Sequence, residues 1–153
     1  MTADQIFSIA NLAAVSCWIL LAVFPDRRRV THGITGTAMP ALFAVAYVAI
    51  VMAVFPRADG SFSTLPGVAQ LFANPWLLLA GWLHYLAFDL LIGAWEARDS
   101  VERGVPRWAL VPCLFLTLMF GPAGWITYRI VRLRHSPKSL VARPESLVQG
   151  PES

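Results

Sequence analysis

The fold is decided by residues 75–95, which read PWLLLAGWLHYLAFDLLIGAW. This run is almost entirely apolar and is long enough to cross a hydrocarbon core of about 30 Å as a helix. Similar apolar runs cover residues 4–24, 38–55 and 108–130. The chain of 153 residues is 57% hydrophobic and only 14% charged, whereas a soluble domain carries about 25% charged residues. We therefore predict an all-α, polytopic membrane four-helix bundle.

This length allows one domain, which we place at residues 1–135, followed by a polar tail at 136–153 that we expect to be disordered. A separate soluble catalytic domain or nucleotide-binding fold is thereby excluded. Cys17 and Cys113 lie inside apolar runs and are interpreted as small hydrophobic residues. The net charge of +3 comes from arginines beside the apolar runs, which is typical of membrane topology signals, so we expect no nucleic-acid partner.

The orientation follows from the first loop. Pro25 ends the first apolar run, and the three arginines at 27–29 predict that this end faces the cytoplasm and that the N-terminus faces outside. The N-terminal residues lack the basic region of a signal peptide and the Arg- and Ser-rich character of a transit peptide. Together with the strong preference for Arg over Lys, this favours the cytoplasmic (inner) membrane of a bacterium.

The fourth run allows two topologies. A simple span over 108–130, bent at Gly121-Pro122, divides the basic residues evenly between the two sides, whereas a re-entrant hairpin turning at Gly121-Pro122 leaves nearly all of them on one side. We favour the bent span, because the run is long enough to cross and a re-entrant piece must be shielded from lipid.

The linker between the second and third runs has its own helical signal. Leu65, Val68 and Phe72 recur at helical spacing, which predicts a short helix lying at the outer interface. Asn74 and Pro75 are typical of a helix start, with Asn as N-cap and Pro in the first turn.

The third run contains the strongest intramembrane chemistry, His84 and Asp89. An ionisable residue at this depth is costly and is by default a candidate functional residue. The two are five positions apart, about 140° around a helix, so they can meet only through a partner on another helix. Tyr85, Asp89 and Glu96 share one stripe, and His84 lies on the adjacent stripe, so the two stripes could flank one cleft.

The residues around this pair complete the predicted site. Aromatic side chains facing inward beside His84 would line a slot suited to an extended apolar molecule. The candidate catalytic residues are His84 and Asp89, and the candidate substrate-binding residues are Trp82, Tyr85, Phe88, Glu96, Arg98 and Asp99. We interpret the charges at 98–103 as a solvated loop, with a clamp for a polar head group as the alternative. One His and two carboxylates on one helix are too few ligands for a metal site, so we expect neither metal nor cofactor.

Three pieces of this sequence form a pattern: Asn74-Pro75-Trp76, HYLAFD at 84–89, and LTLMFGPAG at 116–124. Together they resemble the abscisic-acid-deficient-four-like family of small membrane proteins, found in plant plastids and in many bacteria. The resemblance extends from about Ile6 to Arg132. It implies a four-helix membrane protein and, for the plant members, a requirement in forming neoxanthin from violaxanthin, which is an epoxide-to-allene rearrangement.

These observations lead to a first hypothesis, a redox-neutral isomerase or accessory factor that acts on a carotenoid or another isoprenoid lipid. Asp89 would be its general acid and His84 would accept or relay a proton. The alternative is a non-catalytic scaffold or lipid-binding subunit in which His84 and Asp89 form hydrogen bonds between helices. A third reading is proton or ion movement along Tyr85, Asp89 and Glu96, which would require homo-oligomers to enclose a pore.

Overall fold

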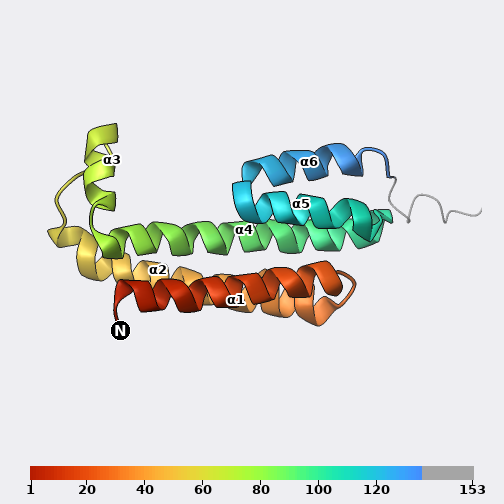
Figure 1. Ribbon diagram of the computed structural model, residues 1–153, viewed down its shortest axis with the longest axis horizontal. Helices are drawn as coiled ribbons and strands as arrows, with labels where there is room; N and C mark the ends of the chain where they lie inside the picture. Colours follow the sequence, from red (N-terminus) through yellow and green to blue (C-terminus); the bar gives the residue numbers. More distant parts are fainter. Residues whose placement is uncertain (136–153) are drawn as a thin grey trace, which may run out of the picture.

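The computed structural model describes residues 1–135, and the predicted disordered tail at 136–153 lies outside the described residues. Over the described range every regular element is helical (Figure 1). In chain order these are α1 (Ala3–Val23), the π-helix η1 (Arg29–Ala38), α2 (Met39–Val54), the 3-10 turn η2 (Phe55–Arg57), α3 (Leu65–Phe72), α4 (Pro75–Arg103), α5 (Arg107–Phe120) and α6 (Pro122–Arg132).

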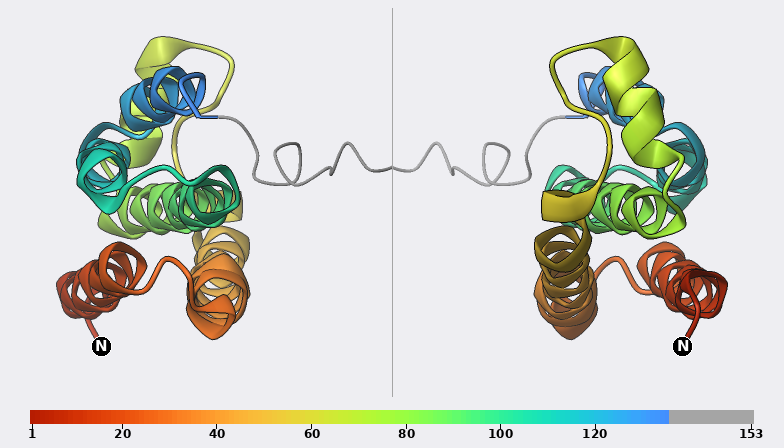
Figure 2. Two further views of the ribbon diagram at one scale, coloured as in Figure 1. Left: turned by 90° about the vertical axis from the view of Figure 1, so that its right-hand side faces the viewer. Right: turned by 90° about the vertical axis from the view of Figure 1, so that its left-hand side faces the viewer.

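Three helices are long and apolar enough to cross a membrane: α1, the continuous helix Arg29–Arg57, and α4. Helix α4 is the centre of the molecule, with α1 and α2 packed on one side and α5 and α6 on the other (Figure 2). Close packing of α1 on α4 depends on Gly93, because a Cβ there would lie 2.5 Å from the buried Trp18 ring. The prediction of helices long and apolar enough to span a membrane is confirmed for the first three runs.

Helix α4 begins as its sequence predicts. The Asn74 side chain accepts a hydrogen bond from the backbone N–H of Trp76 at 2.9 Å, and Pro75 occupies the first turn. The helix ends at Gly104, whose φ of 71° is left-handed and therefore favours glycine. Its 29 residues span roughly 43 Å at 1.5 Å per residue. The predicted loop at 98–103 is wrong, because these residues form the last turns of α4.

The predicted fourth span is also wrong. Gly121, with φ 45° and ψ −95°, reverses the chain between α5 and α6, so residues 108–130 form a helical hairpin and Gly121-Pro122 is a turn instead of a bend (Figure 1). Gly124 allows α6 to lie directly on α5, since a Cβ there would overlap the backbone nitrogen of Thr117. The described residues therefore form three long helices and a hairpin that starts and ends near the C-terminal end of α4.

The second long helix begins with the π-helix η1, in which several carbonyl groups take side-chain partners. The Thr35 and Thr37 hydroxyls donate to the carbonyls of Val30 and His32, at 2.8 and 2.7 Å. Arg98 of α4 donates from Nη1 to the carbonyl of Thr31 at 2.6 Å. The predicted substrate-binding residue Arg98 therefore faces η1, where it ties the second long helix to α4.

Candidate functional site between α4 and the hairpin

The polar stripe of α4 faces the α5–α6 hairpin. The Tyr85 hydroxyl donates to the backbone carbonyl of Leu118 at 2.8 Å. Seven residues after Asp89, the fully buried Glu96 carboxylate lies 3.0 Å from the Thr117 hydroxyl. Spacings of four and seven residues place Tyr85, Asp89 and Glu96 on one side of the helix. Their side-chain oxygen atoms form a row that faces the hairpin.

Asp89 lies at the turn of the hairpin. One carboxylate oxygen is 3.0 Å from the position that a Cβ at Gly121 would occupy, so the side chain faces the start of α6. The residue is only 7% exposed, and Oδ2 is the buried side-chain atom without a hydrogen-bond partner among the described residues. A buried carboxyl oxygen without a donor is unfavourable. Among the residues of the stripe, Asp89 is therefore the one with a hydrogen bond left unmade.

Asp99, one turn beyond Glu96, is by contrast fully engaged. Its Oδ2 accepts a hydrogen bond from the Tyr128 hydroxyl at 2.7 Å. Its Oδ1 forms ion pairs with Arg103 at 3.1 Å and Arg132 at 2.9 Å. These contacts fasten the end of α6 to α4, so Asp99 holds the hairpin in place. Sequence reasoning missed Tyr128 and Arg132; their spacing of one helical turn was the available signal.

His84 faces away from Asp89. Its imidazole lies 5.5 Å from the Tyr47 ring of α2 and 4.7 Å from the Phe88 ring, measured between centroids. Trp82 faces a third direction, because its indole N–H donates to the Asn11 side chain of α1 at 2.8 Å. Phe88 is 55% exposed on the outer surface. The structure therefore does not bring the two predicted catalytic residues together, and it divides the predicted substrate-binding residues among several faces of α4.

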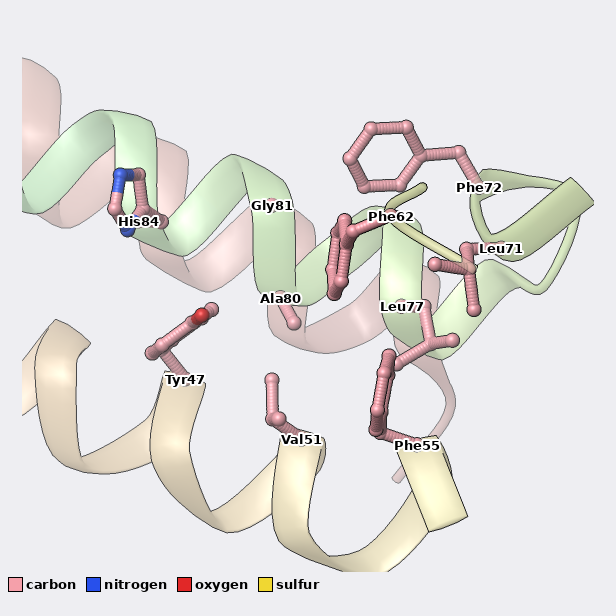
Figure 3. A pocket seen from close by; sticks show the side chains of 10 residues that line it. All are labelled: Tyr47, Val51, Phe55, Phe62, Leu71, Phe72, Leu77, Ala80, Gly81 and His84. Atoms are coloured by element: carbon pink, nitrogen blue, oxygen red, sulfur yellow. The ribbon is translucent and has the colours of Figure 1, made fainter. Parts of the chain in front are cut away.

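A separate cavity of about 310 Å³ lies between α2, α3 and α4, with His84 at one end (Figure 3). Its walls are mostly aromatic and include Tyr47, Phe55, Phe62 and Phe72. The predicted helix at Leu65, Val68 and Phe72 is confirmed as α3, and Phe72 from its last turn reaches this cavity. Sequence reasoning predicted an aromatic slot beside His84 but not these rings, which come from segments far apart in the chain.

Within residues 1–135, no group of three His, Cys, Asp or Glu side chains is placed to hold a metal ion. The fold is that of a helical membrane protein in which the buried carboxylates of α4 face a helical hairpin. The chain belongs to the ABA DEFICIENT 4-like family, whose sequence model matches residues 5–128. No curated protein matches the chain. No solved structure matches it.

Proposed function

We propose that this protein binds an isoprenoid lipid inside the bilayer and catalyses a redox-neutral isomerisation, with Asp89 as the reacting acid. The observation that carries the proposal is the buried, unpartnered Oδ2 of Asp89 at the hairpin turn. Membership in the ABA DEFICIENT 4-like family makes a carotenoid with an epoxide end group the first substrate class to test. The apolar surface around the turn, with Phe120 65% exposed, suits a substrate that approaches from lipid.

One carboxyl group is sufficient for such a reaction. In its acid form, Asp89 donates a proton to the epoxide oxygen as a carbon–oxygen bond breaks, which leaves a hydroxyl group and a positively charged carbon. The resulting carboxylate then removes a proton from the neighbouring carbon as the new carbon–carbon double bond forms. Asp89 regains its proton, and the product is an isomer of the substrate. General acid–base catalysis of this kind contributes about 10²–10⁴-fold to the rate.

The test is chromatography of pigments and neutral lipids from a host that makes epoxy-carotenoids and expresses the intact protein, Asp89→Asn, or neither. We expect a new isomer with the intact protein and its loss, by at least about 100-fold, in Asp89→Asn. Asp59→Asn makes the same chemical change at an exposed position and should leave the product unchanged. Identical profiles for intact protein and empty host would overturn the proposed substrate class.

A non-catalytic scaffold is the second candidate, and the complete engagement of Asp99 by Tyr128, Arg103 and Arg132 favours it. The two candidates differ at Asp89. If Asp89 serves only to hold the helices together, Asp89→Asn should lower the melting temperature in detergent without any change in product. If Asp89 reacts with substrate, the product should disappear while the melting temperature changes little.

We further propose that the N-terminus faces outside and that the C-terminal end of α4 faces the cytoplasm of a bacterium. Figure 1 shows the end of α1, the end of α4, the start of α5 and the end of α6 on one side of the molecule. Within residues 1–135 every arginine except Arg57 belongs to these segments or to the residues that adjoin them: Arg27, Arg28, Arg29, Arg98, Arg103, Arg107, Arg129, Arg132 and Arg134. Cytoplasmic ends of membrane helices are enriched in arginine in this way. The hairpin brings the arginines of α6 to the same side as those of the first loop.

Single cysteines measure this topology. In intact cells, an impermeant thiol reagent should label Phe62→Cys, in the linker before α3, and should not label Asp26→Cys or Leu133→Cys until the membrane is opened. Phe62 and Leu133 are 71% and 83% exposed, so access to reagent is limited only by the membrane. The native Cys17 and Cys113 are buried and provide the unlabelled background. Labelling of Leu133→Cys from outside would contradict the hairpin topology.

A further inference from the structure

We infer that the cavity between α2, α3 and α4 is a second binding site, which takes a flat six-membered ring bearing an oxygen acceptor. The site is separate from Asp89, because His84 faces α2 whereas Asp89 faces the hairpin turn. A volume of about 310 Å³ is at the lower end of the range for small-molecule pockets, about 300–1,000 Å³. It therefore suits the ring of a lipid-soluble molecule, with any chain extending into the bilayer.

The shape of the ligand follows from the walls. The Phe55 and Phe62 rings are stacked almost parallel, with an interplanar angle of 13° and centroids 5.5 Å apart, at one end of the cavity (Figure 3). Phe72 forms a further wall and lies close to Gly81, where a Cβ would be 3.1 Å from the Phe72 ring. Aromatic rings gain from offset-stacked or edge-to-face contacts with another ring beyond the apolar area they bury, and a saturated chain offers no such contacts. A flat ring thus fits this cavity better than a fatty acyl chain.

Two polar groups at the other end of the cavity indicate that the ring of the ligand carries an oxygen atom. Within residues 1–135, the histidine rings that form hydrogen bonds are those of His32 and His135. The tyrosine hydroxyls that do so are those of Tyr85 and Tyr128. His84 and Tyr47, which face the cavity, are left without hydrogen bonds in this range.

His84 is exposed and Tyr47 is half-buried, so both polar groups are accessible to a ligand. Where such a surface faces lipid instead of water, a hydrogen bond left unmade is unfavourable. The imidazole N–H and the phenol O–H can both donate to one acceptor. A ring carbonyl oxygen would satisfy both groups at once. Two kinds of molecule carry this chemistry, a quinone head group and a cyclic ketone, and the binding experiment separates them.

Binding is measured on the intact protein in nanodiscs, as ligand retained above that in empty nanodiscs. The probes are decylubiquinone, the cyclic enone isophorone, and decylbenzene, which has a ring and a chain but no oxygen. We expect at least one oxygenated probe to bind more tightly than decylbenzene. Retention of decylubiquinone alone identifies a quinone site, and retention of isophorone identifies a cyclic ketone site.

The variants separate shape from hydrogen bonding. Val51 points into the cavity (Figure 3), so Val51→Trp fills it and should lower affinity at least tenfold. Val48→Trp places the same side chain on the exposed side of α2 and should bind like the unchanged protein. His84→Phe keeps a ring but removes the donor, and should weaken the oxygenated probe about three- to tenfold without altering decylbenzene. His84→Gln restores an N–H donor and should recover part of that loss.

Phe62→Ala provides a second cavity variant, because Phe62 is 71% exposed and its removal should leave the fold intact while weakening binding. Asp89→Asn should bind the probes normally, so a failure of the proposed isomerase and a failure of this site are distinguishable. Equal binding by Val51→Trp and the unchanged protein would overturn the site. Equal binding of decylbenzene and both oxygenated probes, with no effect of His84→Phe, would overturn the role of the oxygen.

Discussion

Gly124→Ala is expected to destabilise the protein by about 3 kcal/mol or more, the upper end for overpacking a close contact. A Cβ at position 124 would overlap the backbone nitrogen, the Cα and the hydroxyl oxygen of Thr117. Backbone atoms cannot move aside as the tip of a side chain can, so α6 must shift away from α5. The shift would also disturb the Thr117 hydroxyl that serves the buried Glu96. Thermal unfolding in detergent measures the loss.

Gly33→Ala is the matched control. A Cβ at Gly33 would meet no atom within 4 Å. The same substitution there should leave the protein as stable as before or raise its stability by up to about 1 kcal/mol, because alanine loses less conformational freedom on folding. If Gly124→Ala and Gly33→Ala melted at the same temperature, the close contact between α5 and α6 would be contradicted.

Asp99→Ala is expected to cost about 3–5 kcal/mol, as removal of one partner from a buried ion pair does. The arginine side chains that it pairs with are only 24% and 14% exposed, for Arg103 and Arg132. Without the carboxylate they are left as partly buried charges, and the Tyr128 hydroxyl loses its acceptor. Besides a lower melting temperature, we expect proteolysis of residues 107–132 to become faster, because α6 is released from α4.

The exposed pair of Asp26 and Arg107 is the comparison. Their side chains are 52% and 62% exposed, and the ion-pair distance is 3.3 Å. Asp26→Ala should cost less than about 1 kcal/mol, since water and salt screen a surface pair. Equal losses in Asp26→Ala and Asp99→Ala would show that the Asp99 cluster contributes no more than a surface contact.

Hydropathy and helix-end signals were sufficient to predict the long helices and the start of α4 at Asn74-Pro75. They failed at the hairpin because residues 108–130 are as long as a span, and a Gly-Pro pair is compatible with either a bend or a turn. Two features of the folded chain decide in favour of the hairpin. Gly121 has a positive φ, which allows the chain to reverse, and Gly124 approaches Thr117 closely. The distribution of arginines favours the hairpin, whereas the length of the segment favours a span.

The candidate site was predicted in part. Helical geometry predicted that Tyr85, Asp89 and Glu96 share a face and that His84 does not, and the contacts of Tyr85, Asp89 and Glu96 all lie with the hairpin. The partners of that face could not be predicted, because they depend on where the chain reverses. Asp99 was expected in a loop for the same reason: its charge is tolerated in a buried helical turn because Tyr128 and Arg132 of α6 join Arg103 in contacting it.

The hairpin has a consequence for biosynthesis. During translation a segment is integrated from the translocon largely according to its length and apolar character. Helices α5 and α6 have 14 and 11 residues, each shorter than the 17–25 that an independent span requires. Neither is long enough to span alone, so we expect the two helices to be accommodated as a pair packed against α4. We therefore expect the placement of residues 107–132 to depend on prior integration of α4 and on the close contact at Gly124.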